Sequence, residues 1–122
     1  MSGVIIAVVD DMFFASKIRA VAEAVGVEIS FVRSQEALVQ KAREAQPQLI
    51  VVDLHNQKVD AVMLAKDLKS DEELRSIPLL GFFSHVQTDL QRNALAAGFD
   101  QVIARSVFAR DLPKILNHRL HR

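Results

Sequence analysis

Two uninterrupted apolar runs, each ending in acidic residues, constrain the fold of this chain more than any other feature. The first run covers residues 4–9 and stops at Asp10 and Asp11, and the second covers residues 49–52 and stops at Asp53. Both runs are rich in β-branched residues and do not alternate with polar ones, which is typical of strands buried on both faces of a parallel sheet. Because parallel strands bring their carboxyl ends to one edge of the sheet, we expect the three acids to converge there.

Three carboxylates that converge at one edge repel one another, so the arrangement calls for a cation. Carboxylate oxygens are the ligands that Mg²⁺ and other hard divalent cations prefer. Helix capping is the simpler interpretation of Asp10 and Asp11, since acids are favoured at helix N-termini. Two adjacent acids together with Asp53 on the neighbouring strand exceed what capping requires, so we predict a metal site formed by all three.

The composition is that of a single ordinary globular domain, which we take to span residues 1–122. The 15 Lys and Arg residues balance the 15 Asp and Glu residues, so no overall field favours nucleic acid or an anionic membrane. The absence of cysteine excludes disulfides, thiol catalysis and zinc–thiolate sites. No secretory signal and no stretch long enough to span a bilayer is found, and we expect a soluble, cytoplasmic protein.

Strand and helix patterns alternate five times along the chain, and every linker is too short for anything but a right-handed crossover. This repetition predicts an α/β domain with a doubly wound parallel sheet and three layers. The last helix is predicted from about residue 107, with Pro113 in its first turn. The predicted strands cover residues 4–9, 27–31, 49–53, 79–83 and 102–104. The predicted helix ends are marked by Gly26, Ser34, Asp60, a capping box of Thr88 with Gln91, and Gly98.

Four short motifs, in order along nearly the whole chain, resemble those of response-regulator receiver domains of the chemotaxis-regulator kind. They are the acidic pair after the first strand, the strand that ends in Asp53, Ser84 after the fourth strand, and the turn Gly98-Phe99-Asp100. The acidic pair alone would be a weak signal, whereas four motifs in the correct order form a strong one. The resemblance implies a flavodoxin-like strand order of 2-1-3-4-5, with the first and third strands adjacent at the centre.

The resemblance also implies a role for each residue at the acidic edge. Asp53 would accept a phosphoryl group, and Mg²⁺ would be held by Asp10, Asp11, Asp53 and the backbone carbonyl of His55. The Ser84 hydroxyl would donate a hydrogen bond to a phosphoryl oxygen and draw the loop after the fourth strand inward.

Some residues depart from the family pattern at the end of the fifth strand. Arg105-Ser106 stands where the family has Lys-Pro, and Val102 stands where it has an aromatic switch residue. Arginine is always charged and can pair with phosphate through two nitrogens, so we assign Arg105 to the phosphoryl group.

Two functions of different kinds remain open. The first is a stand-alone receiver of two-component phosphorelay signalling, with a histidine kinase or phosphotransfer protein as donor. It would signal by docking a protein partner on the face formed by the fourth helix, the fifth strand and the fifth helix. The second is a pseudo-receiver, a constitutive interaction module that has abandoned phosphotransfer.

Enzymatic functions fit less well. A flavodoxin-type cofactor protein needs a phosphate-binding loop rich in Ser, Thr and Gly after the first strand, where this chain has acids. An aspartate-nucleophile phosphatase would need an acid/base residue two positions past Asp53, and His55 is the candidate. We expect no enzyme beyond catalysis of the domain's own phosphorylation and dephosphorylation.

Overall fold

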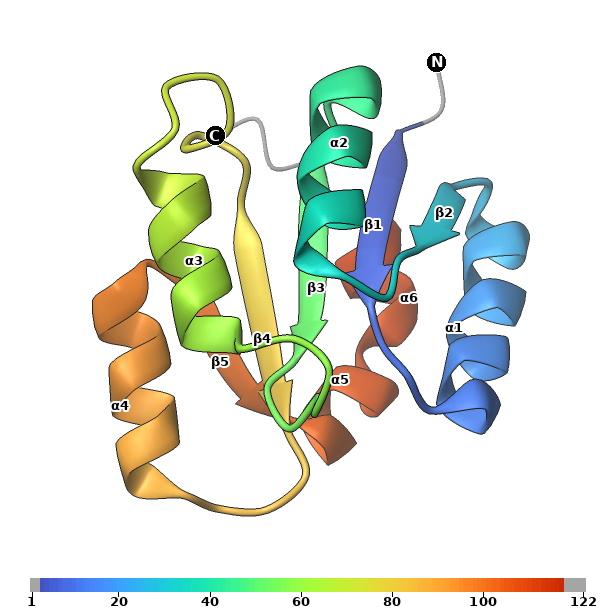
Figure 1. The fold of residues 1–122 in the computed structure, drawn as a ribbon. Helices are drawn as coiled ribbons and strands as arrows, with labels where there is room; N and C mark the ends of the chain where they lie inside the picture. Colours follow the sequence, from blue (N-terminus) through green and yellow to red (C-terminus); the bar gives the residue numbers. More distant parts are fainter. Residues whose placement is uncertain (1–2, 118–122) are drawn as a thin grey trace.

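The computed structural model describes residues 3–117, which form a five-stranded parallel sheet covered by helices on both faces (Figure 1). Within this range, no helix is long and apolar enough to cross a membrane. The strands are β1 (Val4–Val8), β2 (Glu28–Phe31), β3 (Leu49–Asp53), β4 (Leu79–Phe83) and β5 (Gln101–Ala104). The helices are α1 (Met12–Val25), α2 (Gln35–Ala45), α3 (Ala61–Lys69), α4 (Thr88–Ala97), α5 (Arg105–Arg110) and α6 (Leu112–Asn117).

The strand order is β2-β1-β3-β4-β5, and each neighbouring pair is parallel. This order confirms the predicted three-layer, doubly wound α/β fold. The outer strands β2 and β5 are only half-buried, as expected for strands at the edges of a sheet. β1 and β3 lie next to each other near its centre, which places the two acid-bearing strands side by side.

Alternate residues of the central strands face opposite layers of helices and enter two separate cores. On one face, Ile6 and Ile50 form a core with side chains from α2, α3 and α4. On the other face, Ile5 and Val51 form a core with side chains from α1, α5 and α6. Both faces of β1 and β3 are therefore covered by apolar side chains, which explains why their sequences do not alternate with polar residues.

Three predicted helix ends are confirmed by their backbone geometry and hydrogen bonds. Ser34 Oγ accepts a hydrogen bond from Ala37 N at 3.0 Å, and Asp60 Oδ1 accepts one from Met63 N at 3.0 Å. Gly26 ends α1 in the left-handed conformation, with φ 77°, where the lack of a Cβ atom avoids strain.

The predicted capping box of Thr88 and Gln91 is wrong by one residue. α4 begins at Thr88, and its N-cap is Gln87, whose side chain makes no capping hydrogen bond. The backbone N–H of Gln87 donates to Gln91 Oε1 at 3.2 Å. Gln91 thus accepts a hydrogen bond from the N-cap backbone, as a capping box requires, but it does so from the fourth helical position, and the N-cap residue lacks a hydroxyl group.

The last helical segment begins earlier than predicted and is broken in the middle. α5 begins at Arg105 rather than near residue 107, and Asp111 separates it from α6. Pro113 lies in the first turn of α6, which agrees with the prediction. A proline has no N–H to donate and its ring clashes with the preceding turn, so one helix cannot run unbroken through this position.

Lys69 holds the amino ends of β4 and β5. Its Nζ donates to the carbonyl oxygens of Arg75 at 3.0 Å and Ile77 at 3.1 Å, and it pairs with Asp100 Oδ2 at 3.2 Å. Asp100 Oδ2 also accepts a hydrogen bond from Leu79 N at 2.8 Å. All three donors of the ammonium group are thus used at the edge of the sheet opposite the acids.

Three buried phenylalanines join α1, β4 and α5. The rings of Phe82 and Phe108 stack with centroids 4.9 Å apart, and Phe14 meets Phe82 edge-on at 5.4 Å. Each ring is 5% exposed or less. These three phenylalanines, which we call the aromatic cluster, connect segments whose ends reach the acidic edge.

We predict that Phe82→Ala lowers the free energy of unfolding by about 3–5 kcal/mol, because it leaves a cavity between two rings. Urea denaturation measures this change. Phe13→Ala is the matched control, since Phe13 is 92% exposed and its loss is expected to change stability by about 0.5 kcal/mol or less. Equal effects of the two substitutions would contradict a central role for the aromatic cluster.

Candidate functional site

The carboxyl ends of β1 and β3 bring the three predicted acids to one edge of the sheet. Val8 of β1 lies opposite Val52 of β3. Asp53 is the last residue of β3, and Asp10 and Asp11 follow β1 in its connection to α1. The connections that leave β1, β3, β4 and β5 all lie at this end of the sheet (Figure 1). We call this end the acidic edge.

Asp11 is the N-cap of α1. Its Oδ1 accepts hydrogen bonds from Phe13 N at 2.9 Å and from Phe14 N at 3.1 Å. The bond from Phe14, followed by the guanidinium of Arg105, holds the pKa of the Asp11 carboxyl below its usual range. The capping interpretation of Asp11 is therefore confirmed, whereas its role as a metal ligand stays a prediction.

Arg105 pairs with Asp11 across the acidic edge. Arg105 Nη2 donates to Asp11 Oδ2 at 3.1 Å, and both side chains are about one-third exposed, at 34% and 38%. The guanidinium carbon lies 4.1 Å from the centroid of the Phe14 ring, which is a cation–π distance. Arg105 was predicted from the sequence as a site residue, but its ion pair with Asp11 was not, although both residues follow strands that end at the same edge.

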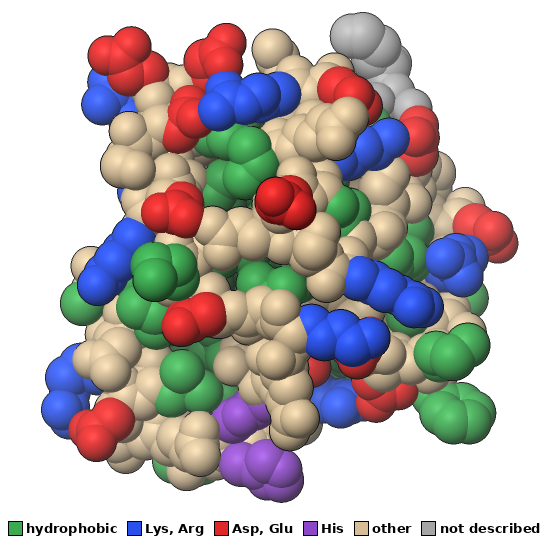
Figure 2. All heavy atoms as spheres, in the orientation of Figure 1, with side chains coloured by type: hydrophobic (Ala, Val, Ile, Leu, Met, Phe, Trp, Pro, Cys, Tyr) green, Lys and Arg blue, Asp and Glu red, His purple; other side chains and the backbone are tan. Residues whose placement is uncertain are grey.

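A second cation reaches the acidic edge from the loop between β3 and α3. Lys58 Nζ lies 3.6 Å from Asp10 Oδ1, and the two side chains are 56% and 40% exposed. Lys58 was not predicted from the sequence, because a lone lysine in a loop belongs to no motif. Figure 2 shows acidic and basic side chains adjoining near this end of the molecule.

Asp53 is half-buried and fixed by the backbone that follows it. Its Oδ1 accepts a hydrogen bond from His55 N at 2.9 Å. His55 Nε2 in turn lies 3.3 Å from both the backbone N and the backbone O of His85. The two rings meet edge-on with centroids 5.5 Å apart, so this contact joins the loops after β3 and β4. Figure 2 shows histidine side chains at the lower rim of the molecule.

Ser84 reaches the same edge from β4. Asp53 lies opposite Phe82 in the β3–β4 register, and Ser84 follows two residues later as β4 ends. The Ser84 side chain is exposed. The fold thus brings Asp10, Asp11, Asp53, His55, Ser84 and Arg105 to one end of the sheet, from four different strand ends.

The acidic side chains do not form a ready cluster of metal ligands. In the described part of the chain, no group of three or more His, Asp or Glu side chains could hold a metal ion as it stands. Asp10 and Asp11 face Lys58 and Arg105 instead. By chemistry the set still fits a hard divalent cation, because all three acids offer carboxylate oxygens at adjoining strand ends.

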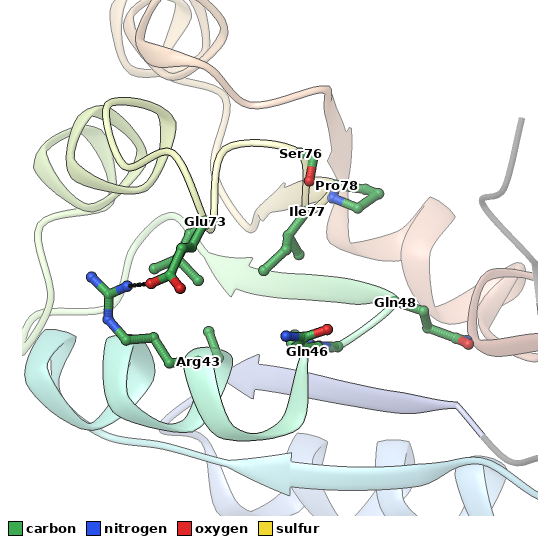
Figure 3. A pocket seen from close by; sticks show the side chains of 10 residues that line it. Arg43, Gln46, Gln48, Glu73, Ser76, Ile77 and Pro78 are labelled. Carbon is green, nitrogen blue, oxygen red and sulfur yellow. Dashed lines mark hydrogen bonds and ion pairs between the residues drawn. The ribbon is translucent and has the colours of Figure 1, made fainter.

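A pocket of about 500 Å³ lies at the opposite edge of the sheet, between the end of α2 and the loop before β4 (Figure 3). Arg43 and Glu73 form an ion pair across its mouth, and Asp71 also pairs with Arg43. The hydrogen bond to Asp71 is the main reason why the pKa of Arg43 is raised. The guanidinium of Arg43 at this pocket is thus held by two carboxylates.

Comparison of sequences finds similar proteins among response regulators. The polar-differentiation response regulator DivK of Brucella ovis is 30% identical to the chain over 89 residues, which are 73% of this chain and 72% of that protein. The same protein of Brucella abortus matches to the same extent. No protein-family model matches the chain.

Solved structures of the same fold cover almost the whole chain. A putative response regulator from Chloroflexus aurantiacus has a TM-score of 0.86 at 19% identity, with 100% of both chains covered. The receiver domain of a histidine kinase from Syntrophus aciditrophicus has 0.80 at 25% identity, with 99% and 94% covered. The receiver domain of a sensor histidine kinase from Pseudomonas aeruginosa, with magnesium coordinated in its active-site cleft, has 0.84 at 19% identity and full coverage of both chains.

We predict that Asp11→Asn reduces the loss of stability on acidification. Because the folded-state pKa of Asp11 is lowered, its contribution is present above the ordinary carboxyl pKa and is lost as pH falls through the folded value. Asparagine still caps the helix but carries no charge. The free energy of unfolding, measured by urea denaturation from about pH 5 to about pH 2, should therefore fall less steeply in the variant than in the wild type.

The double variant separates the contribution of Arg105 to this effect. Arg105→Gln removes the second cause of the lowered Asp11 pKa, so the free energy of unfolding should fall less steeply with acidification than in the wild type, though more steeply than in Asp11→Asn. In the double variant Asp11→Asn/Arg105→Gln, the pH dependence should be the same as in Asp11→Asn alone. If the free energy of unfolding of Asp11→Asn fell with pH in parallel with that of the wild type, the lowered pKa of Asp11 would be contradicted.

Proposed function

Because this chain belongs to the response-regulator receiver family, we propose that it accepts a phosphoryl group on Asp53 in two-component signalling. Receiver domains are signalling modules rather than typical enzymes, and the described residues of this chain share their fold. The observation that carries the proposal is the position of Asp53 at the end of central strand β3, with Asp11, Ser84 and Arg105 at neighbouring strand ends.

The reaction at Asp53 is a simple displacement at phosphorus. A carboxylate oxygen of Asp53 attacks the phosphoryl group of a phosphohistidine, the P–N bond breaks, and the imidazole leaves with a proton from solvent. The hydrogen bond from His55 N holds Asp53 Oδ1 in place, so its other oxygen, Oδ2, is the one we assign as nucleophile. The product is an acyl phosphate on the protein.

A divalent cation fits this chemistry, and Asp10, Asp11, Asp53 and the backbone carbonyl of His55 are the groups we expect to hold it. When bound, Mg²⁺ neutralises phosphoryl oxygens that otherwise repel an attacking carboxylate. Support comes from the oxygen-rich donor set and from the magnesium ion in the receiver domain of Pseudomonas aeruginosa.

Ser84 and Arg105 are the residues we assign to the phosphoryl group itself. The exposed Ser84 hydroxyl can rotate to donate a hydrogen bond to a phosphoryl oxygen. The Arg105 guanidinium can pair with two phosphoryl oxygens through parallel N–H groups. Formation of these two contacts would shift the segments that follow β4 and β5.

We propose a histidine kinase or phosphotransfer protein as donor, and a protein partner that docks on the face of α4, β5 and α5, with the exchange in the cytoplasm. Leu95 on α4 is 51% exposed, and Arg92 on α4 and Arg110 on α5 are exposed cations. Figure 2 shows apolar and charged side chains mixed over α4. Such a mixed surface is typical of a transient docking site. We propose no contact with nucleic acid or membrane.

A pseudo-receiver that binds partners without phosphorylation is the second candidate. It is favoured by the Arg105–Asp11 ion pair, which occupies the acidic edge. It is also favoured by half-buried Val102 on β5, which offers no aromatic ring to move between inside and outside.

Intact-mass spectrometry after incubation with acetyl phosphate distinguishes the two functions. With Mg²⁺ we expect a gain of one phosphoryl group, which is lost without Mg²⁺ and in Asp53→Ala. Asp89→Ala is the matched control, because the Asp89 side chain is 92% exposed at the start of α4, where it pairs with Arg92, and this variant should still be modified. No adduct under conditions that modify a control receiver would reject phosphorylation and favour the pseudo-receiver.

A further inference from the structure

The oxygens of Asp11 are already in use in this structure. Oδ1 accepts two backbone hydrogen bonds, from Phe13 N and Phe14 N, which match its two lone pairs. Oδ2 accepts a third bond from Arg105 Nη2. One lone pair of Oδ2 remains, and it lies beside a positively charged guanidinium.

Arg105 is held in this position from two sides. Asp11 provides the carboxylate, and the face of Phe14 lies 4.1 Å from the guanidinium carbon. Phe14 is 5% exposed and packs against Phe82 and Phe108, so its ring is fixed by the aromatic cluster. The charged group is therefore preorganised on Asp11.

The chain also supplies much of the charge that a metal would bring. Three carboxylates at the acidic edge carry three negative charges, and Lys58 and Arg105 provide two positive charges in contact with Asp10 and Asp11. The repulsion that led us to predict a cation is thus reduced by the protein's own side chains.

We propose that Arg105 acts as a built-in competitor of the divalent cation for Asp11. The guanidinium occupies Oδ2 in the resting state, and a cation binds Asp11 only as the guanidinium moves away. This inference rests on the proposed function, since it concerns the same acidic edge. The inference adds a regulatory step to that function, because cation binding would release the Arg105 guanidinium, which we assign to the phosphoryl oxygens.

The expected change in the Mg²⁺ binding constant follows from the interactions that Arg105 must lose, which are its ion pair with Asp11 and its cation–π contact with Phe14. A partly exposed ion pair and a cation–π contact together give roughly a three- to tenfold effect on a binding constant. Removing the guanidinium should therefore tighten Mg²⁺ binding by that factor, because both interactions are absent from the variant.

Isothermal titration calorimetry with MgCl₂ tests the proposal on the full chain. The chain contains no Trp or Tyr, so a heat measurement is more suitable than intrinsic fluorescence. We expect Arg105→Gln to bind Mg²⁺ about three- to tenfold more tightly than the wild type, with Arg105→Lys in between, because lysine keeps the charge but not the planar fork.

Two matched substitutions control for general charge effects. Arg110→Gln makes the same change on the same helix, at a residue that pairs with Asp111, and should leave the dissociation constant unchanged. Lys58→Gln removes the same charge from the more exposed pair with Asp10, and should have a smaller effect than Arg105→Gln. Equal tightening by Lys58→Gln and Arg105→Gln would overturn the proposal, since it would show a nonspecific charge effect.

A second measurement follows the guanidinium directly. In ¹⁵N-labelled wild type, the Arg105 Nε–H resonance, identified by its loss in Arg105→Lys, should shift as Mg²⁺ saturates the protein. A resonance that does not move at saturation would show that the guanidinium stays on Asp11, and would overturn the proposal.

The outcomes also separate this inference from the proposed function. Tighter Mg²⁺ binding by Arg105→Gln without any phosphorylation of Asp53 in either protein would support the competitor and reject the phosphoacceptor. Phosphorylation of the wild type, with equal Mg²⁺ dissociation constants in the wild type and Arg105→Gln, would support Asp53 as the phosphoacceptor and reject Arg105 as a competitor of Mg²⁺.

Discussion

Burial of the central strands on both faces is the constraint on which the rest of this structure depends. The side chains of β1 between Ile5 and Val8 are fully buried, and Ile50, Val51 and Val52 of β3 are at most 1% exposed. A polar group inside such a strand would lose its hydration without a partner, so the chemistry is displaced to the strand ends. Because all strands run in one direction, the acids of two strands and the side chains that follow two others meet at a single edge.

The packing that encloses the sheet also positions the site. Phe14 belongs to the core between the sheet and α1, and its ring face carries the guanidinium of Arg105. The backbone N–H of the same residue donates to Asp11. One buried aromatic residue therefore connects the hydrophobic core, the start of a helix and the ion pair at the acidic edge, which makes the site an extension of the core rather than an addition to its surface.

Features that depend on periodicity and local hydrogen bonds could be predicted from the sequence, and features that depend on long-range side-chain contacts could not. The apolar runs were sufficient to place β1 and β3, and Ser34 and Asp60 were recognised as helix caps because their partners are three residues away. The strand order came from the resemblance and was confirmed.

The ion pairs at the acidic edge could not be predicted from the sequence. Arg105 and Asp11 are 94 positions apart, and their contact depends on the crossovers and on the ring of Phe14. The contact of Lys58 with Asp10 depends on the path of a loop. The break at Asp111 was also missed, because the apolar pattern continues across it and only the backbone changes direction.

The network around Lys69 has a consequence for how this protein can change in evolution. It fixes the amino ends of β4 and β5 with bonds that involve none of the residues at the acidic edge. These bonds therefore remain in place when residues at the acidic edge are substituted. Substitutions such as Arg105-Ser106 for Lys-Pro can then accumulate at the acidic edge without loss of the bonds that hold the other end of the sheet, so a lineage can change one end of the domain while it keeps the other.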